Sequence, residues 1–157
     1  MIKILLLISL LPPRYLSISE GTVYAVGQLL CKGQPYAYEH VRIYEKNYVF
    51  RDSEWMETKT DQYGNFSMKV WGSDYPTVTP YVYVPNYCGS KLSVGRRCSS
   101  GGLQINIPAS YITERHVPEK EFDIGSVELH NNDDSERLGL GYILWGVFAK
   151  TMECKDY

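Results

Sequence analysis

The stretch Thr58-Lys-Thr-Asp-Gln-Tyr-Gly-Asn-Phe-Ser-Met-Lys-Val70 decides the fold predicted for this chain. Its second half alternates between an apolar face (Phe66, Met68 and Val70) and a polar face (Ser67 and Lys69). A period of two with one apolar face is typical of a half-buried β-strand. Asp61 can accept hydrogen bonds within a turn, and Gly64 can take a positive φ without steric cost. We therefore predict a β-hairpin with its turn at Asp61–Asn65.

Short alternating stretches recur along the rest of the chain. They predict strands over residues 22–31, 39–45, 54–60, 65–71, 77–84, 91–94, 103–107 and 122–129. No long segment has the period of a helix. Short strands at regular spacing, separated by turn residues, indicate an all-β fold. We expect a disulfide-stapled β-sandwich of about 7–8 strands.

Two of these strands carry irregularities with structural consequences. Pro80 lies inside the strand at 77–84 and cannot donate to a ladder, so this strand is expected at a sheet edge or with a bulge. The strand at 122–129 changes parity, because Phe122 and Ile124 are even-numbered whereas Val127 and Leu129 are odd-numbered. A β-bulge at Gly125 would return both pairs to one face.

Residues 1–19 have the features of a secretory signal peptide. Lys3 precedes an apolar run over residues 4–11, which is too short to span a membrane. Ser17 and Ser19 are small residues suited to cleavage after Ser19. The alternative is that this run is a buried strand or helix of a cytosolic protein. We expect a secreted protein, located outside the cell or at the cell surface.

The charge balance argues against two classes of partner. Cleavage would remove Lys3 and Arg14, which leaves 14 of the 16 Lys and Arg residues against 18 Asp and Glu residues. A nucleic-acid surface needs clustered positive charge, so no nucleic-acid partner is expected. The mature chain also has no polybasic patch for anionic lipid.

Four cysteines, Cys31, Cys88, Cys98 and Cys154, remain after cleavage. In an exported chain an even number indicates two disulfides, with three possible connectivities. We expect Cys88–Cys98, because the two are close in sequence and flank chain rich in Gly and Ser, which leaves Cys31–Cys154. Thiolate pairs at zinc spacing are missing and no His lies nearby, so no metal or other cofactor is expected.

The chain divides into a signal peptide (1–19), a sandwich domain (20–130) and a C-terminal part (131–157). Residues 131–137 form a polar linker, and residues 138–149 are apolar and uncharged. This tail is too short to span a bilayer, and no other segment could span one. It is expected to pack on the sandwich as an extra strand or short helix. A surface that docks a partner or a membrane is the alternative.

Several blocks resemble the nematode transthyretin-like proteins. The blocks are Gly27-Gln-Leu-Leu-Cys-Lys-Gly-Gln-Pro35, Val41-Arg-Ile-Tyr44, Thr58–Phe66, Tyr87-Cys88, Ile105-Asn-Ile-Pro108, Ser110-Tyr-Ile-Thr113 and Lys120-Glu-Phe-Asp-Ile-Gly125. They occur in consistent order over about residues 21–130. The resemblance implies a secreted, prealbumin-like β-sandwich that carries a small hydrophobic or lipid ligand, or that binds a cell-surface protein. The chain departs from the family in the apolar segment before Cys154.

The resemblance also raises an enzymatic alternative, since transthyretin-like folds include hydrolases of 5-hydroxyisourate. Those enzymes have His and Arg in their site and a C-terminal Tyr-Arg-Gly-Ser, whereas this chain ends Cys-Lys-Asp-Tyr. Its histidines, His40, His116 and His130, lie in unrelated sequence contexts. We therefore expect no catalytic residues and no enzyme activity, with a divergent hydrolase as the alternative.

Two further features suggest surface roles. Asn65-Phe-Ser67 is an N-glycosylation sequon at a turn, where the asparagine should be exposed. Tyr44, Tyr81, Tyr83 and Tyr87 fall on or next to the outward parity of two strands, and together they form a possible binding face. Cross-strand packing explains the tyrosines equally well, and the geometry of the turn explains the asparagine.

Overall fold

The computed structural model describes residues 18–90, 92–99, 101–129 and 153–156. Residues 1–17, His130, the linker and the apolar tail therefore lie outside the described residues. The strands are β1 (Glu20–Cys31), β2 (Gln34–Pro35), β3 (His40–Glu45), β4 (Ser53–Lys59), β5 (Asn65–Ser73), β6 (Pro80–Pro85), β7 (Leu92–Ser93), β8 (Arg96–Ser99), β9 (Gly102–Asn106), β10 (Phe122–Glu128) and β11 (Glu153–Asp156), and a 3₁₀ turn, η1, spans Ala109–Tyr111.

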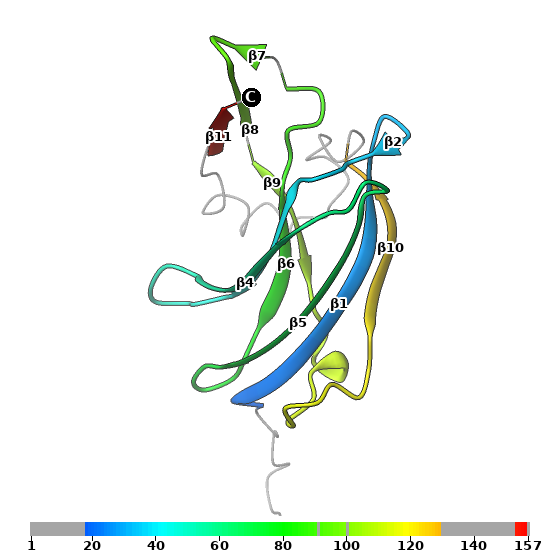
Figure 1. The fold of residues 1–157 in the computed structure, drawn as a ribbon. Coiled ribbons are helices and arrows are strands. Elements are labelled where there is room, and N and C mark those ends of the chain that lie inside the picture. The colour runs from blue at the N-terminus through cyan, green and yellow to red at the C-terminus, as the bar shows by residue number, and fades with distance from the viewer. Residues whose placement is uncertain (1–17, 91, 100, 130–152, 157) are drawn as a thin grey trace, which may run out of the picture.

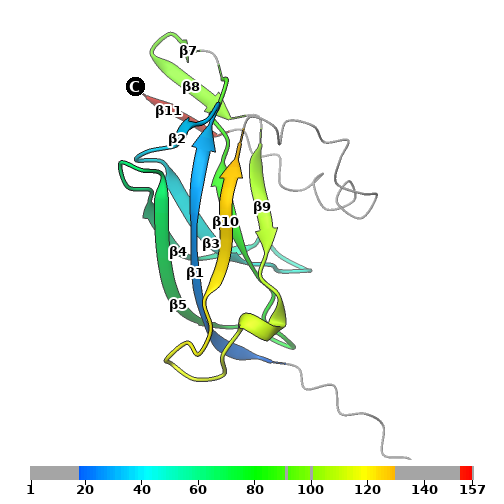
Figure 2. The same cartoon turned by 90° about the vertical axis from the view of Figure 1, so that its right-hand side faces the viewer.

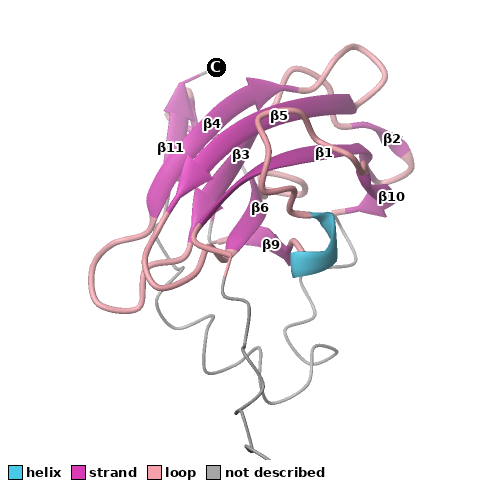
Figure 3. Ribbon diagram, turned by 90° about the horizontal axis from the view of Figure 1, so that it is seen from below, coloured by secondary structure: helices cyan, strands magenta, loops and turns pink. Residues whose placement is uncertain are grey.

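Two sheets pack face to face, as Figures 1 and 3 show. The first sheet has the order β10-β1-β5, with β2 also paired to β1, and β10 runs parallel to β1. The second has the order β4-β3-β6-β9. A small third sheet, β11-β8-β7, lies at the end of the sandwich near β2 (Figure 2). The predicted all-β sandwich is confirmed.

The core fills the space between the two sheets. Its members are the apolar residues at alternate positions of the central strands. These residues are Val23, Ala25 and Leu29 of β1, Phe66 and Met68 of β5, Val41 and Ile43 of β3, and Val82 and Val84 of β6. The alternation read from the sequence at 66–70 therefore marks the inner face of a strand, as expected.

The predicted hairpin at Asp61–Asn65 is wrong in one respect. The turn exists, because the Asp61 N–H donates to the Asn65 carbonyl at 2.8 Å. However, β4 pairs with β3 in the second sheet and β5 pairs with β1 in the first, so the turn carries the chain across the sandwich. Buried Thr60 still pairs with the β3 side, its N–H donating to the Glu39 carbonyl at 2.9 Å. The alternation of one strand does not say which neighbour it joins.

Gly64 is needed in this turn for two separate reasons. Its φ is +79°, in the left-handed region that favours glycine. A Cβ at this position would also lie 2.3 Å from the Leu29 carbonyl oxygen, which leaves no room for a side chain. The turn is thereby held against β1, where the Leu29 N–H donates to the Gly64 carbonyl at 2.9 Å.

We expect Gly64→Ala to lower the free energy of unfolding by about 3 kcal/mol, the strain of a positive φ plus the steric conflict with Leu29. Urea unfolding would measure it. Gly33→Ala is the matched control, because Gly33 has φ +72° but a Cβ added there would meet nothing within 4 Å. That variant should lose only about 1 kcal/mol. Equal losses in the two variants would contradict the close approach to Leu29.

Of the expectations for the two irregular strands, one is wrong and one is confirmed. Pro80 begins β6, which lies between β3 and β9, so the expectation of an edge strand is wrong. Pro80 is the first residue of the strand, a position where the missing backbone N–H of proline is tolerated. Its carbonyl accepts from the Ile107 N–H at 3.0 Å. The expected bulge is confirmed: the β1–β10 register shifts between Val26 and Gln28, and Gly125 has φ +70°.

The expected disulfide pairing is wrong, although all four cysteines are bonded. The bonds are Cys31–Cys88 and Cys98–Cys154. Cys31 ends β1 in the first sheet and Cys88 follows β6 of the second, so their bond ties the two sheets together at one end. The β7–β8 hairpin carries Cys98 away from Cys88 and places it directly opposite Cys154 in β11. Proximity in the fold, not in sequence, sets the pairing. No helix within the described ranges has the length and apolarity of a membrane span.

Candidate functional site

The tyrosines of the expected binding face lie on the outside of the second sheet and just beyond β6. Tyr44 of β3 stacks on Tyr81 of β6 with ring centroids 5.7 Å apart, and meets Tyr83 edge-on at 5.8 Å. Tyr44 is half-buried, but Tyr81, Tyr83 and Tyr87 are buried. Cross-strand packing accounts for these rings. The three buried tyrosines do not offer the exposed surface that their outward parity suggested.

The protonation of these phenols is also fixed by their surroundings. Burial, with a 2.6 Å hydrogen bond from the Tyr81 hydroxyl to Asp52 Oδ2, raises the pKa of Tyr81 well above its usual range. Burial raises the pKa of Tyr83 to about 12. Both phenols therefore stay protonated to a higher pH than an exposed tyrosine does.

Charged residues of β11 lie over one end of this outer face. Both carboxylate oxygens of Glu153 accept from Arg42 of β3, at 2.7 and 2.9 Å. The Lys155 ammonium pairs with Glu39 and lies 4.6 Å from the centroid of the Tyr87 ring. These contacts, together with the Cys98–Cys154 bond, attach the C-terminal strand to the sandwich.

His40 and His116, the histidines among the described residues, have different neighbours. His40 lies beside Arg42 on the outer face, and both contact Glu57. His40 Nδ1 lies 2.9 Å from Glu57 Oε1, and Arg42 Nε lies 2.5 Å from Glu57 Oε2. His116 lies against Trp71 instead, with ring centroids 5.2 Å apart. Within the part of the chain that the structure describes, no three His, Cys, Asp or Glu residues are grouped to hold a metal ion.

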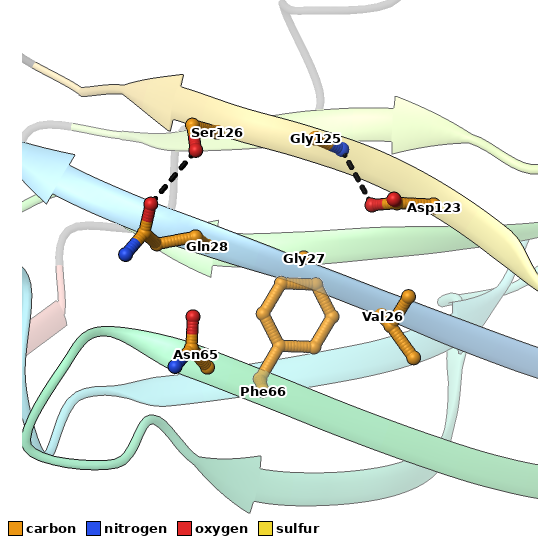
Figure 4. A pocket seen from close by; sticks show the side chains of 8 residues that line it. All are labelled: Val26, Gly27, Gln28, Asn65, Phe66, Asp123, Gly125 and Ser126. Carbon is orange, nitrogen blue, oxygen red and sulfur yellow. Dashed lines mark hydrogen bonds between the residues drawn. The ribbon is translucent and has the colours of Figure 1, made fainter.

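A depression lies on the outside of the first sheet, among β1, β5 and β10 (Figure 4). Its polar groups bind one another: Ser126 Oγ donates to Gln28 Oε1 at 2.7 Å, and the Gly125 N–H donates to Asp123 Oδ1 at 2.8 Å. At Gly27 a Cβ would lie 2.3 Å from a side-chain carbon of Ile124, so the core is closed beneath this point. The depression is a polar surface feature and not an entrance to the interior.

Asn65 stands at the rim of this depression with its side chain exposed, and its amide donates to Asp61 Oδ2 at 3.2 Å. We expect N-glycosylation here when the protein is secreted from a eukaryotic host. Digestion with an N-glycosidase should then increase its gel mobility, and Ser67→Ala, which removes the sequon but keeps Asn65, should abolish the shift. Secreted protein whose mobility is unchanged by the glycosidase would contradict this expectation.

The loop that joins β3 to β4 carries three exposed residues outside the expected binding face. Tyr48, Val49 and Phe50, called here the aromatic tip, are 64%, 81% and 78% exposed. Asn47 Oδ1 accepts from the N–H groups of both Val49 and Phe50 at 3.0 Å. The Asn47 N–H in turn donates to Asp52 Oδ1 at 2.9 Å. Three consecutive apolar residues in a polar loop were the available signal.

Comparison with known proteins assigns the chain to a family. Residues 26–108 match the model of the family described as "TTR-52: Transthyretin-like family". This chain belongs to the transthyretin-like family. The matched range of this transthyretin-like chain includes the turn at Asp61–Asn65, the aromatic tip and three of the four cysteines. The match confirms the resemblance that the sequence blocks indicated.

Two curated relatives come from Caenorhabditis elegans. "Transthyretin-like protein 46" is 30% identical over 112 residues, which cover 70% of this chain and 60% of that protein. "Transthyretin-like protein 1" is 29% identical over 115 residues, covering 69% of this chain and 71% of the relative. This transthyretin-like chain thus matches about 60% of the length of the first relative. A crystal structure of a 9R-lipoxygenase from Cyanothece overlaps 69% of the chain at 18% identity and a TM-score of 0.38, which supports no conclusion.

Proposed function

We propose that this transthyretin-like protein is secreted, has no enzymatic activity, and binds a partner at cell surfaces through the aromatic tip. The observation that carries the proposal is the exposure of three consecutive apolar side chains on a loop that is fixed by its own hydrogen bonds. Exposed apolar residues gathered at one point favour an interaction site over a solvated loop.

Carriage of a small hydrophobic ligand is less well supported. The side chains between the two sheets, such as Leu29, Ile43 and Met68, are almost completely buried against one another. Two depressions among the described residues lie on the outside of the first sheet and at its turn, with polar residues around them. Small apolar ligands usually bind in concave pockets that are lined mostly by apolar side chains. Contact at the surface is therefore the preferred mode of binding.

Secretion is supported by the two disulfides, which persist in oxidising compartments. Two hydrogen bonds bear on the position of signal-peptide cleavage, which was expected after Ser19. The Ile18 carbonyl accepts from the Val78 N–H at 2.7 Å, and the Ser19 carbonyl accepts from the Asp74 N–H at 2.9 Å. Cleavage after Ser19 would remove both acceptors, so we place it before Ile18. N-terminal sequencing of the secreted protein would test the position.

The absence of activity is proposed against one alternative, a divergent 5-hydroxyisourate hydrolase. His40 and Arg42 do lie on one face, but Arg42 already contacts Glu57 and Glu153, and His40 contacts Glu57. An arginine paired with two carboxylates in this way favours a structural role. We expect the ultraviolet absorbance of hydroxyisourate to decay at the uncatalysed rate in the presence of the protein. Faster decay would contradict the proposal.

The binding proposal predicts the effect of a tip variant. Labelled Val49→Asp/Phe50→Asp protein should bind intact nematode cells at least about tenfold more weakly than the wild type, because both apolar contacts are lost. Tyr63→Ser is the matched control, since Tyr63 is also exposed but lies beyond the opposite end of β4. Its binding should equal that of the wild type. Undiminished binding of the tip variant would contradict the proposed function.

A further inference from the structure

We infer that the partner of the aromatic tip is the interface of a lipid bilayer, into which Tyr48, Val49 and Phe50 insert. This inference deepens the proposed function and rests on it. The alternative partner class, a cell-surface protein, becomes an outcome of the test below.

The shape of the tip suits a planar interface. The loop between β3 and β4 projects from the side of the sandwich in both views (Figures 1 and 2). Its apolar residues are consecutive and more than half exposed, so they form a convex point and not a groove. A convex point with Tyr and Phe can sink between lipid headgroups, where aromatic rings are favoured.

Two backbone N–H groups of the aromatic tip have acceptors within the loop itself. An N–H that enters an apolar region without an acceptor is costly, and this cost usually keeps loops out of membranes. Here the N–H groups of Val49 and Phe50 already donate to Asn47 Oδ1, and Asp52 Oδ1 accepts from the Asn47 N–H. The tip can therefore leave water without breaking these bonds.

The flanking charges indicate which lipids the tip would accept. Lys46 and Arg51 stand on either side of the tip, and the Lys46 ammonium lies 5.9 Å from the centroid of the Tyr48 ring. Asp52 follows at once, and the mature chain as a whole is acidic, so there is no strong basic field. Burial of apolar surface, and not attraction to anionic lipid, should then drive binding. We expect binding to zwitterionic phosphatidylcholine, with little dependence on salt.

The experiment uses the secreted full-length protein with Phe50→Trp as the probe. On phosphatidylcholine vesicles, the emission of this variant should shift to the blue and be quenched by brominated acyl chains. The wild type provides the background from the three native tryptophans. Vesicle sedimentation should show binding weakened about 30-fold or more by Val49→Asp/Phe50→Asp and unchanged by Tyr63→Ser. Adding phosphatidylglycerol or raising the salt should change binding less than about threefold.

The possible failures separate the two proposals. If Phe50→Trp shows neither shift nor quenching on vesicles, the bilayer inference is overturned. The proposed function survives that result when the tip variant still loses binding to cells, because the partner is then a protein. Vesicle binding that is unaffected by Val49→Asp/Phe50→Asp also overturns the inference, since another segment must then insert.

Discussion

Replacing Cys31 and Cys88 together by serine is expected to lower the free energy of unfolding by about 4 kcal/mol. The bond closes a loop with a sequence separation of 57 residues, and opening it gives the unfolded chain that conformational freedom back. It also joins the end of β1 in the first sheet to the chain after β6 in the second. Urea unfolding of the variant and the wild type in oxidising buffer would measure the loss.

The second disulfide provides the matched control for this prediction. Cys98–Cys154 has nearly the same sequence separation, 56 residues, so loop entropy alone predicts an equal loss. We expect a smaller one, because β11 belongs to the small third sheet and can detach without opening the core. A larger loss for Cys98→Ser/Cys154→Ser than for Cys31→Ser/Cys88→Ser would contradict the assignment of the first bond as the main tie between the sheets.

Glu45→Gln is expected to be more stable than the wild type by about 3 kcal/mol at pH 8. The Glu45 residue is only 2% exposed at the end of β3. Its Oε1 accepts from the Thr79 N–H at 2.6 Å, but its Oε2 has no hydrogen-bond partner among the described residues. Burial raises the pKa of this carboxyl from 4.5 to about 7. Glutamine keeps the acceptor for Thr79 and removes the cost of a buried charge.

The dependence on pH follows from the raised pKa. Between pH 4.5 and about 7 the folded state holds a proton that the unfolded state has released, so the contribution of Glu45 to stability falls as the pH rises through this window. Above about pH 7 the loss is complete, and below pH 4.5 it vanishes. The difference between variant and wild type in urea unfolding, measured from pH 4 to 8, isolates this group. Parallel stability curves would show that the carboxyl is not perturbed.

Single strands could be predicted from the sequence because the apolar and polar residues of a half-buried strand alternate. Phe66 and Met68 lie in the core as the alternation indicated, and the change of parity at Gly125 located a real bulge. The crossing of the chain at Asp61–Asn65 could not be predicted in this way. A turn between two amphipathic strands has the same sequence pattern whether the strands pair with each other or belong to different sheets. The hydrogen-bond partners of Thr60 and Gly64 in the structure distinguish these two cases.

The site was harder to predict for a related reason. Outward parity placed Tyr81 and Tyr83 on the outside of a sheet, but exposure depends on what else lies over that sheet, which alternation does not report. The cysteine pairing failed because the β7–β8 hairpin separates Cys88 from Cys98. The aromatic tip was visible as three consecutive apolar residues, but its exposure and its internal hydrogen bonds required the fold.

The most direct test of the proposed binding site needs no substitution. Hydrogen exchange of the secreted protein, read by mass spectrometry, should be compared with and without membranes prepared from nematode cells. We expect the added membranes to slow exchange over residues 46–52 and to leave the turn at Asp61–Asn65 unchanged. Slower exchange elsewhere on the sandwich, with residues 46–52 unaffected, would contradict the aromatic tip as the site of binding.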